Sequence, residues 1–251
     1  MHEVIVAALI FVCLVGASLG TLLTYGKLAP HHRQEDTNTT VRLVANIFVV
    51  MTSLVLGLMI NSAKNTFEAI DHNVHAYATA LILFDRTARE IGPAANDVHE
   101  GLITYVRRAV NVDETTEDPL VRGDRTSEAM LESVGKSLNA IKPADDQQAA
   151  LWDDARQQFR KIVEQRWVLV EQSEGSIPPL LIVMLVAWLI LIFASFGYRA
   201  PRNMVIVTMF VLSAFLISAS LYLILDLDVP FSGPIQVSDA PMRRALAEFQ
   251  Q

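Results

Sequence analysis

A stripe of polar and small side chains recurs at helical spacing between residues 46 and 75. Successive members are three, four or seven residues apart, so they fall on one narrow face of a single helix. Amide, hydroxyl, ammonium and carboxylate groups in such a row can bind water and inorganic ions. This polar stripe consists of Asn46, Ser53, Gly57, Asn61, Lys64, Glu68, Asp71 and His75, and Ile60 borders it.

Polar groups inside a bilayer need partners or water, so we do not expect the polar stripe to face lipid. One explanation is that it lines a water-filled pathway on a symmetry axis between subunits. The other is that it packs against the neighbouring spans, with its polar groups bonded internally. Lys64 also has two possible roles. A ring of lysines, one from each subunit, would attract anions to a pore mouth, whereas a single lysine would anchor the helix at the membrane interface.

A second constellation follows the last apolar stretch, where two carboxylates and a rigid turn stand together. The carboxylates could form a cation site or a gating contact, or they could cap a helix or pair with a basic residue. A hard cation such as Ca²⁺ takes about six to eight oxygen ligands, so two carboxylates favour the structural role. The residues are Asp226, Asp228, Pro230, Phe231, Ser232 and Gly233.

Other candidate chemistry is weak. His72 and His75 with Asp71 have a spacing that could hold a metal, but no further ligand is evident, and solvated histidines explain the pattern better. His99-Glu100 lacks the second histidine of a zinc protease helix. No glycine-rich phosphate loop or nucleophile elbow occurs. We therefore expect no metal, no cofactor and no catalytic residues, and we do not expect an enzyme.

The elements that must position these residues are apolar helices. Of the 251 residues, 52% are hydrophobic, and they are concentrated in four stretches that carry almost no charge. A helix needs about 20 apolar residues to cross the hydrocarbon core of a bilayer. The sequence therefore predicts four membrane spans, at residues 4–23, 43–60, 177–196 and 204–225. Small-residue notches at Gly16/Gly20 and Ala214/Ser218 indicate close helix packing within the protein.

The region between the second and third spans is helical in pattern. No Gly or Pro interrupts residues 61–91, so the second span should continue to Ile91, where Gly92-Pro93 ends it. Apolar stripes predict further helices at 93–110, 126–141 and 145–174, and a short helix capped by Ser238 that lies at the interface or docks on the insert. The expected fold is all-α: a four-span membrane helical bundle with an extramembrane helical domain inserted. The expected division is 1–63, 64–176, 177–225 and 226–251.

Positive charge in the short loops predicts the orientation. Lys27, Arg33 and Arg42 follow the first span, and Arg199 and Arg202 stand between the third and fourth. Short loops rich in Lys and Arg stay in the cytoplasm. We expect a multi-pass protein of the cell inner membrane whose insert and both termini are extracytoplasmic. The net charge of −7 argues against a nucleic-acid partner.

Three blocks of the sequence resemble the bestrophin-like family of bacterial and plant membrane proteins. They are residues 54–67 (LVLGLMINSAKNTF), 84–107 (FDRTAREIGPAANDVHEGLITYVR) and the region 196–245, which contains FGYRAPRN and LILDLDVPFSGPIQVSDAPMRRA. The family usually has Arg where this chain has Val229, so no role of that arginine is carried over. The resemblance covers nearly the whole chain.

The family's name implies kinship with bestrophins, which are homo-oligomeric anion channels with four spans per subunit and a pore lined by the second span. Bestrophins place their helical domain in the cytosol, which conflicts with the orientation that the loop charges predict. We expect a homo-oligomer in the lipid bilayer that conducts small inorganic ions, preferably anions. The alternative is a non-conducting membrane protein whose helical domain binds a partner or senses envelope conditions.

Overall fold

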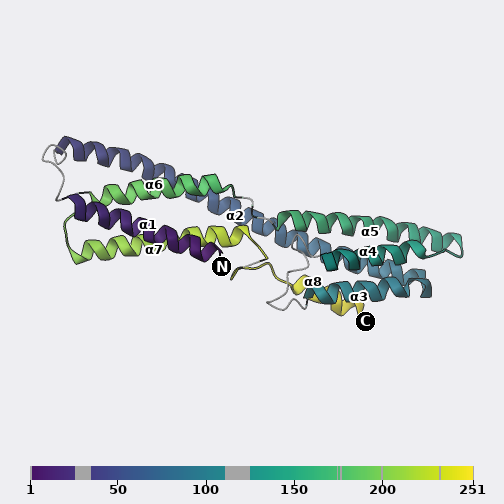
Figure 1. Ribbon diagram of the computed structural model, residues 1–251. Helices are drawn as coiled ribbons and strands as arrows, with labels where there is room; N and C mark the ends of the chain where they lie inside the picture. The colour runs from purple at the N-terminus through teal and green to yellow at the C-terminus, as the bar shows by residue number, and fades with distance from the viewer. Residues whose placement is uncertain are drawn as a thin grey trace. The chain divides into compact units, whose positions relative to one another are not determined.

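The computed structural model describes residues 2–25, 35–110, 125–173, 175, 177–198, 200–231 and 233–250. Within these ranges every regular element is a helix, which confirms the all-α prediction (Figure 1). The chain divides into two compact units. The first unit contains Met1–Thr66 and Ser176–Asp228, and the second unit contains Phe67–Gly175 and Val229–Gln251.

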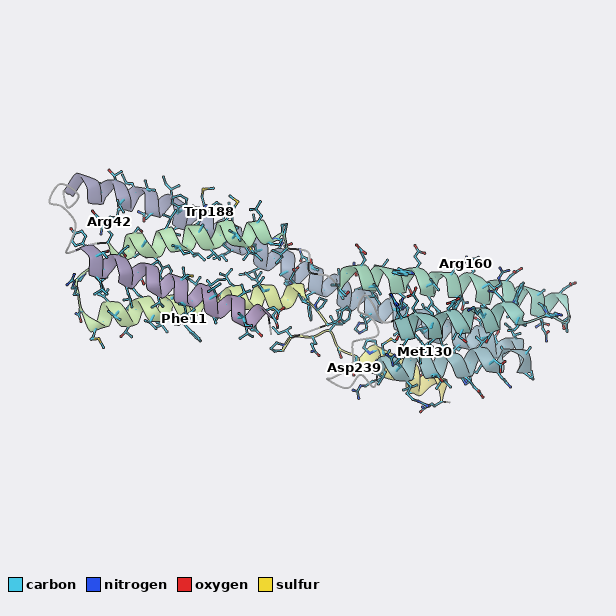
Figure 2. All side chains as sticks on the ribbon, in the orientation of Figure 1. Phe11, Arg42, Met130, Arg160, Trp188 and Asp239 are labelled. Atoms are coloured by element: carbon cyan, nitrogen blue, oxygen red, sulfur yellow. The ribbon has the colours of Figure 1, made fainter. Side chains whose placement is uncertain are left out.

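The first unit holds the apolar helices. It consists of α1 (His2–Thr24), α6 (Pro179–Gly197), α7 (Met204–Asp228) and the first part of α2 (Glu35–Ile91). Four helices of the described chain are long and apolar enough to cross a membrane, so the four predicted spans are confirmed as helices of that kind. Leu14 of α1, Met59 of α2, Leu189 of α6 and Leu221 of α7 are buried in one apolar cluster. Trp188 of α6, labelled in Figure 2, lies 6.4 Å from the Phe48 ring of α2, measured between ring centroids.

Helix α2 is one uninterrupted helix of 57 residues. The sequence predicted that the second span continues to Ile91, and this is confirmed. The helix ends there because Gly92 adopts a φ of 95°, a left-handed conformation that suits glycine. It begins at Glu35, before the predicted start of the span, because residues 35–42 contain no Gly or Pro that would prevent helix formation.

The second unit packs four helices against the second part of α2. A 3₁₀ turn, η3 (Pro93–Ala95), precedes α3 (Asn96–Val110), and α4 (Arg125–Ala140) and α5 (Asp146–Gln172) follow. These bounds differ from the predicted ones by a few residues at the ends, and the start of α3 shifts to Asn96 because Pro93–Ala95 forms a 3₁₀ turn. Asp145 caps α5, because its Oδ1 accepts a hydrogen bond from the Gln148 amide at 2.7 Å. The hydroxyls of Tyr77 and Tyr105 lie 2.7 Å apart inside the core that joins α2 to α3.

The fourth of these helices, α8 (Ala240–Phe249), docks on the second unit. Met242, Ala245 and Phe249 are buried in the same apolar cluster as Leu102 of α3. This decides between the two places predicted for the helix, since its apolar face is covered by the insert. The predicted cap was wrong by one residue. Asp239 is the N-cap, while Ser238 Oγ accepts a hydrogen bond from the Ala240 amide at 3.2 Å.

Glycines in the first unit show where its helices touch. Gly16 and Gly20 have open space where a Cβ would lie, so the predicted packing notch on α1 is wrong within the chain. Ala214 and Ser218 of α7 are buried as predicted. The close contact is elsewhere: a Cβ at Gly197 of α6 would overlap the backbone of α1.

Candidate functional site

The polar stripe lies on the surface of the chain along α2. Seven of its members are exposed and Asp71 is half-buried; the exposed members are Asn46, Ser53, Gly57, Asn61, Lys64, Glu68 and His75. Ile60, which borders the stripe, is 47% exposed. The side chains that the sequence grouped by spacing therefore share one exposed helix face.

The buried face of α2 is a different one. In the first unit it consists of Ala45, Thr52, Met59 and Ala63, which recur at steps of seven and four. At about 100° per residue this seam lies roughly 120° around the helix from the polar stripe. The neighbouring helices α1, α6 and α7 cover the seam and leave the stripe uncovered.

A third face of α2 is exposed and apolar. It lies on the far side of the polar stripe from the buried seam, at roughly 100° from the stripe. Its members are Leu43, Val44, Ile47, Met51, Leu54 and Leu58. The first unit therefore exposes two surfaces of opposite chemistry on one helix, an apolar one that suits lipid or another chain and a polar one that suits water.

Within one chain these exposures show that the neighbouring spans do not bury the polar stripe, and its role as a pore lining stays a prediction. Ser53 Oγ is satisfied within α2, because it donates to the Val49 carbonyl at 2.8 Å. His75 Nδ1 likewise lies 2.8 Å from the Asp71 carbonyl oxygen and 3.6 Å from an Asp71 carboxylate oxygen. The stripe is therefore available to solvent or to a second chain.

In the first-unit part of α2, the structure buries a polar residue that the sequence did not single out. Thr52 is 4% exposed, and its hydroxyl has no hydrogen-bond partner. Ser53, which was predicted, is its exposed neighbour. No feature of the sequence separates two adjacent hydroxyl residues, because only the packing decides which one faces inward.

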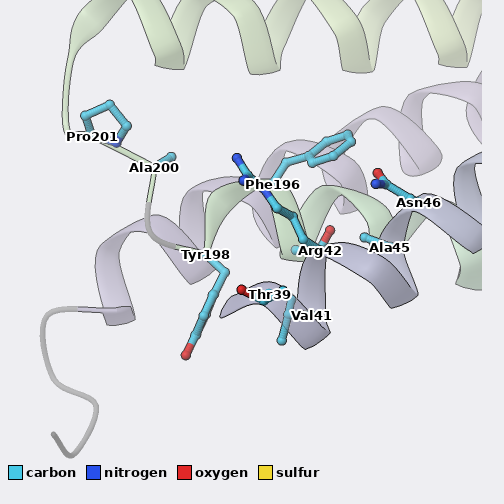
Figure 3. Close-up of a pocket in the computed structure, with 10 residues that line it drawn as sticks. Thr39, Val41, Arg42, Ala45, Asn46, Phe196, Tyr198, Ala200 and Pro201 are labelled. Carbon is cyan, nitrogen blue, oxygen red and sulfur yellow. The ribbon is translucent and has the colours of Figure 1, made fainter. Parts of the chain in front are cut away.

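A cavity of about 550 Å³ opens at the start of the polar stripe, within the first unit. Arg42 and Asn46 of α2 contribute polar side chains to its lining, as do Thr39 of α2 and Ser195 of α6. Phe196 and Tyr198 close it from the end of α6, and Ala200 and Pro201 from the segment that follows (Figure 3). An arginine thus stands one helical turn before the first residue of the stripe, and both line the same water-accessible space.

The two acids at the end of α7 are buried. Asp226 is 2% and Asp228 is 5% exposed. An Asp228 carboxylate oxygen accepts a hydrogen bond from the Ile177 amide at 3.1 Å, just before α6 begins, and Asp226 Oδ1 accepts one from the Tyr222 hydroxyl at 3.4 Å. These contacts are of the kind that the structural role predicts, and a gating role stays a prediction.

The turn after these acids belongs to the second unit. The Pro230 carbonyl accepts a hydrogen bond from the Val237 amide at 3.0 Å, and Phe231 packs against the core of that unit. Gly233 adopts a φ of 100°, which explains why glycine stands there. Ser232 was predicted with this group and lies outside the described residues.

No three His, Cys, Asp or Glu side chains gather in the described ranges in a way that could hold a metal.

One polar cluster that the sequence did not predict joins α2 to α3. Asp85 is 1% exposed, and its two carboxylate oxygens lie 2.6 Å from His99 Nδ1 and 3.0 Å from Arg89 Nε. The only signal for it in the sequence is that Asp85 itself interrupts the apolar run of residues 80–84.

Comparison with known proteins agrees with this architecture. Residues 12–242 match the family described as Bestrophin-like domain. The fold resembles a crystal structure of a variant bacterial bestrophin homologue from Klebsiella pneumoniae, with a TM-score of 0.64 and 12% identity over 97% of both chains. A second variant of that homologue gives 0.63 and 13% identity over 100% of this chain and 99% of the other. A structure titled only as a membrane protein gives 0.61 and 13% identity over 97% and 96%.

A comparison with curated proteins found no match. The solved structures establish the fold, since their sequences are too different from this one to establish more. The family match extends over most of the chain, from α1 into α8. On this evidence the chain belongs to the bestrophin-like family of membrane proteins.

Proposed function

We propose that the protein forms a homo-oligomeric membrane channel for small anions, with α2 lining the pore. The observation that carries the proposal is the exposed polar stripe on an apolar helix. An amide or hydroxyl group in the hydrocarbon core is unfavourable when it faces lipid without a hydrogen-bond partner, and a water-filled space removes that cost. One chain cannot enclose such a space, but several copies around a symmetry axis can.

The charges on α2 favour anions. Arg42 and Lys64 stand near the two ends of the part of the stripe that belongs to the first unit, and Asn46, Ser53 and Asn61 lie between them. Cations at the ends of a narrow pathway raise the local concentration of anions. Amide and hydroxyl groups along it can replace part of an anion's hydration shell. Bestrophins, to which the family name refers, are anion channels, and this also supports selectivity for anions.

In this proposal residues 1–63 and 177–225 form the membrane part, residues 64–176 lie outside it, and residues 226–251 form a C-terminal turn and short amphipathic helix. Arg202 donates to the Leu23 carbonyl at 3.0 Å, and the rings of Tyr25 and Tyr198 lie 5.0 Å apart, so the ends of both short loops meet at one end of the first unit. We propose that this end is cytoplasmic. A reporter fused after Gln251 should then be active outside the cytoplasm, and activity only inside would reverse the orientation.

The test is conductance of the purified full chain in liposomes under a KCl gradient. We expect a current whose reversal potential lies toward the chloride equilibrium potential. Lys64→Glu should move the reversal potential toward that of potassium, and Asn61→Leu should reduce the current. The matched control is Lys161→Glu, which makes the same charge reversal at an exposed position of α5.

The conductance measurements distinguish a channel from a non-conducting protein. If all variants behave alike while the wild type conducts, α2 does not line the pathway. If the wild-type bilayer stays sealed under every ion gradient, the protein is not a channel. The alternative of a non-conducting membrane protein, whose helical domain binds a partner or senses envelope conditions, would then stand.

A further inference from the structure

A cavity of about 380 Å³ in the second unit is lined by residues of α4 and α5. Its α4 wall is formed around Gly135 and its α5 wall by Phe159, Arg166 and Trp167. The volume falls in the lower part of the range of about 300–1,000 Å³ that is typical of ligand sites. The proposed ion pathway uses none of these residues.

The unusual member of the lining is Arg166. Its side chain is 4% exposed, and its buried Nε has no hydrogen-bond partner. In the described part of the chain Arg166 forms no ion pair with any carboxylate. A guanidinium group does not lose its proton in a protein, and a buried charge without a partner is strongly unfavourable. The cavity is therefore lined by a buried cation that forms no ion pair with any carboxylate of the described residues.

The cavity also has an aromatic floor and rim. A Cβ at Gly135 would lie 2.7 Å from Phe159 Cε1, so only glycine lets the ring pack this close to α4. The Phe159 ring also packs against the ring of Phe84 in α2, with 5.7 Å between ring centroids. Trp167 is 51% exposed at the rim, with its ring 5.9 Å from Arg166 Cζ. An apolar ligand body would thus find aromatic surface on two sides of the buried cation.

The rim limits how much charge the ligand carries. Glu128 and Glu132 are exposed lining residues, and Glu132 pairs with Lys136 at 2.8 Å. Two carboxylates near the entrance repel a polyanion more than a singly charged acid. A single negative group at Arg166 and a neutral apolar body match this arrangement.

We propose that the cavity is a binding site for a small organic acid with one carboxylate and an apolar body. Its carboxylate accepts hydrogen bonds from Nε and the adjacent guanidinium nitrogen of Arg166, the bidentate pairing that this group favours. Its body packs against Phe159 and Trp167. The site would make the second unit a sensor of such an acid, separate from the ions that the proposed channel conducts.

The experiment is titration of 3-phenylpropionate into the purified full chain, followed by calorimetry and by tryptophan fluorescence. We expect saturable binding, and binding at least tenfold weaker for 3-phenylpropionamide, which has the same shape without the charge. Arg166→Met should weaken the acid by more than tenfold. The matched control is Arg156→Met on the same helix, where the guanidinium stacks on Trp152 at 4.6 Å outside the cavity, and it should bind as the wild type does.

A stability readout separates a ligand group from a structural one. Without the acid, Arg166→Met should keep or raise the Tm, because it removes an unpaired buried charge. The acid should raise the Tm of the wild type and not that of the variant. Equal affinity for the acid and the amide would overturn the proposal. So would absence of binding together with loss of the oligomer in Arg166→Met, which would assign the guanidinium to a carboxylate of a second copy.

Discussion

Gly197 is where α6 approaches α1 most closely, and replacing it should separate the two helices. A Cβ at this position would overlap the Ser18 carbonyl oxygen and Thr21 Oγ1, and it would lie 3.0 Å from the Ser18 carbonyl carbon. Ordinary van der Waals contact begins at 3.4 Å. Ser18 O cannot turn away, because it belongs to the helix backbone. Gly197→Ala therefore requires the two helices to move apart by about 1 Å, which forfeits up to about half of the dispersion energy of the contacting atoms.

The expected cost is about 1–3 kcal/mol, the usual range for an overpacked core position. For a chain of this size that corresponds to a fall in Tm of about 2–12 °C. Cys13 provides the assay, since it is the only cysteine of the chain and lies half-buried in α1. A thiol-reactive dye that fluoresces on coupling reports the temperature at which α1 leaves the bundle in detergent.

The matched controls are Gly16→Ala and Gly20→Ala on α1, where a Cβ meets nothing within 4 Å. Alanine is a better helix former than glycine by up to about 1 kcal/mol, so these variants should have an unchanged or higher Tm. A Gly197→Ala protein as stable as the two controls would show that α1 and α6 do not pack as described.

Two further substitutions test contacts of buried carboxylates, one in each unit. His99→Ala should lower the free energy of unfolding by about 1.5–3 kcal/mol, because it removes a hydrogen bond to the buried Asp85 carboxylate. The control, His72→Ala at an exposed position, should change it by less than about 0.5 kcal/mol. Thermal unfolding followed by tryptophan fluorescence compares the two variants, and equal effects would count against the buried pair. Asp228→Ala should cost about 1–3 kcal/mol, because it leaves the half-buried Ile177 amide without this acceptor. An unchanged Tm in the same assay would show that this hydrogen bond is not structural.

The sequence could predict which residues form the candidate site, but not whether their helix face is buried or exposed. The spacing of Asn46, Ser53, Asn61 and Lys64 is enough to place them on one face, because the period of a helix is fixed. Whether that face points into the bundle depends on how α2 is rotated against its neighbours. The sequence left both possibilities open, and the packing of Met59 and its buried neighbours decides that the face points outward.

The sequence also could not predict where two helices come closest together or which charged residue is buried. The predicted notch at Gly16 and Gly20 rested on a spacing that is common in membrane helices, while the glycine that touches another helix, Gly197, has no partner at that spacing. Arg166 gives no signal either, since arginine in a polar helix is usually solvated, and only the fold buries it.

The sequence alone determined the helices of this protein: four apolar stretches, a second span that continues to Ile91, and a polar stripe along it. These follow from local rules, since hydrophobic length, helical period and the Gly92 stop act within a few residues of chain. Tertiary structure alone decided which face of α2 is covered, where α6 meets α1, and that Arg166 is buried beside a cavity without an ion pair among the described residues. Those outcomes depend on side chains that are distant in sequence, because burial is a property of the partners a residue meets and not of the residue itself.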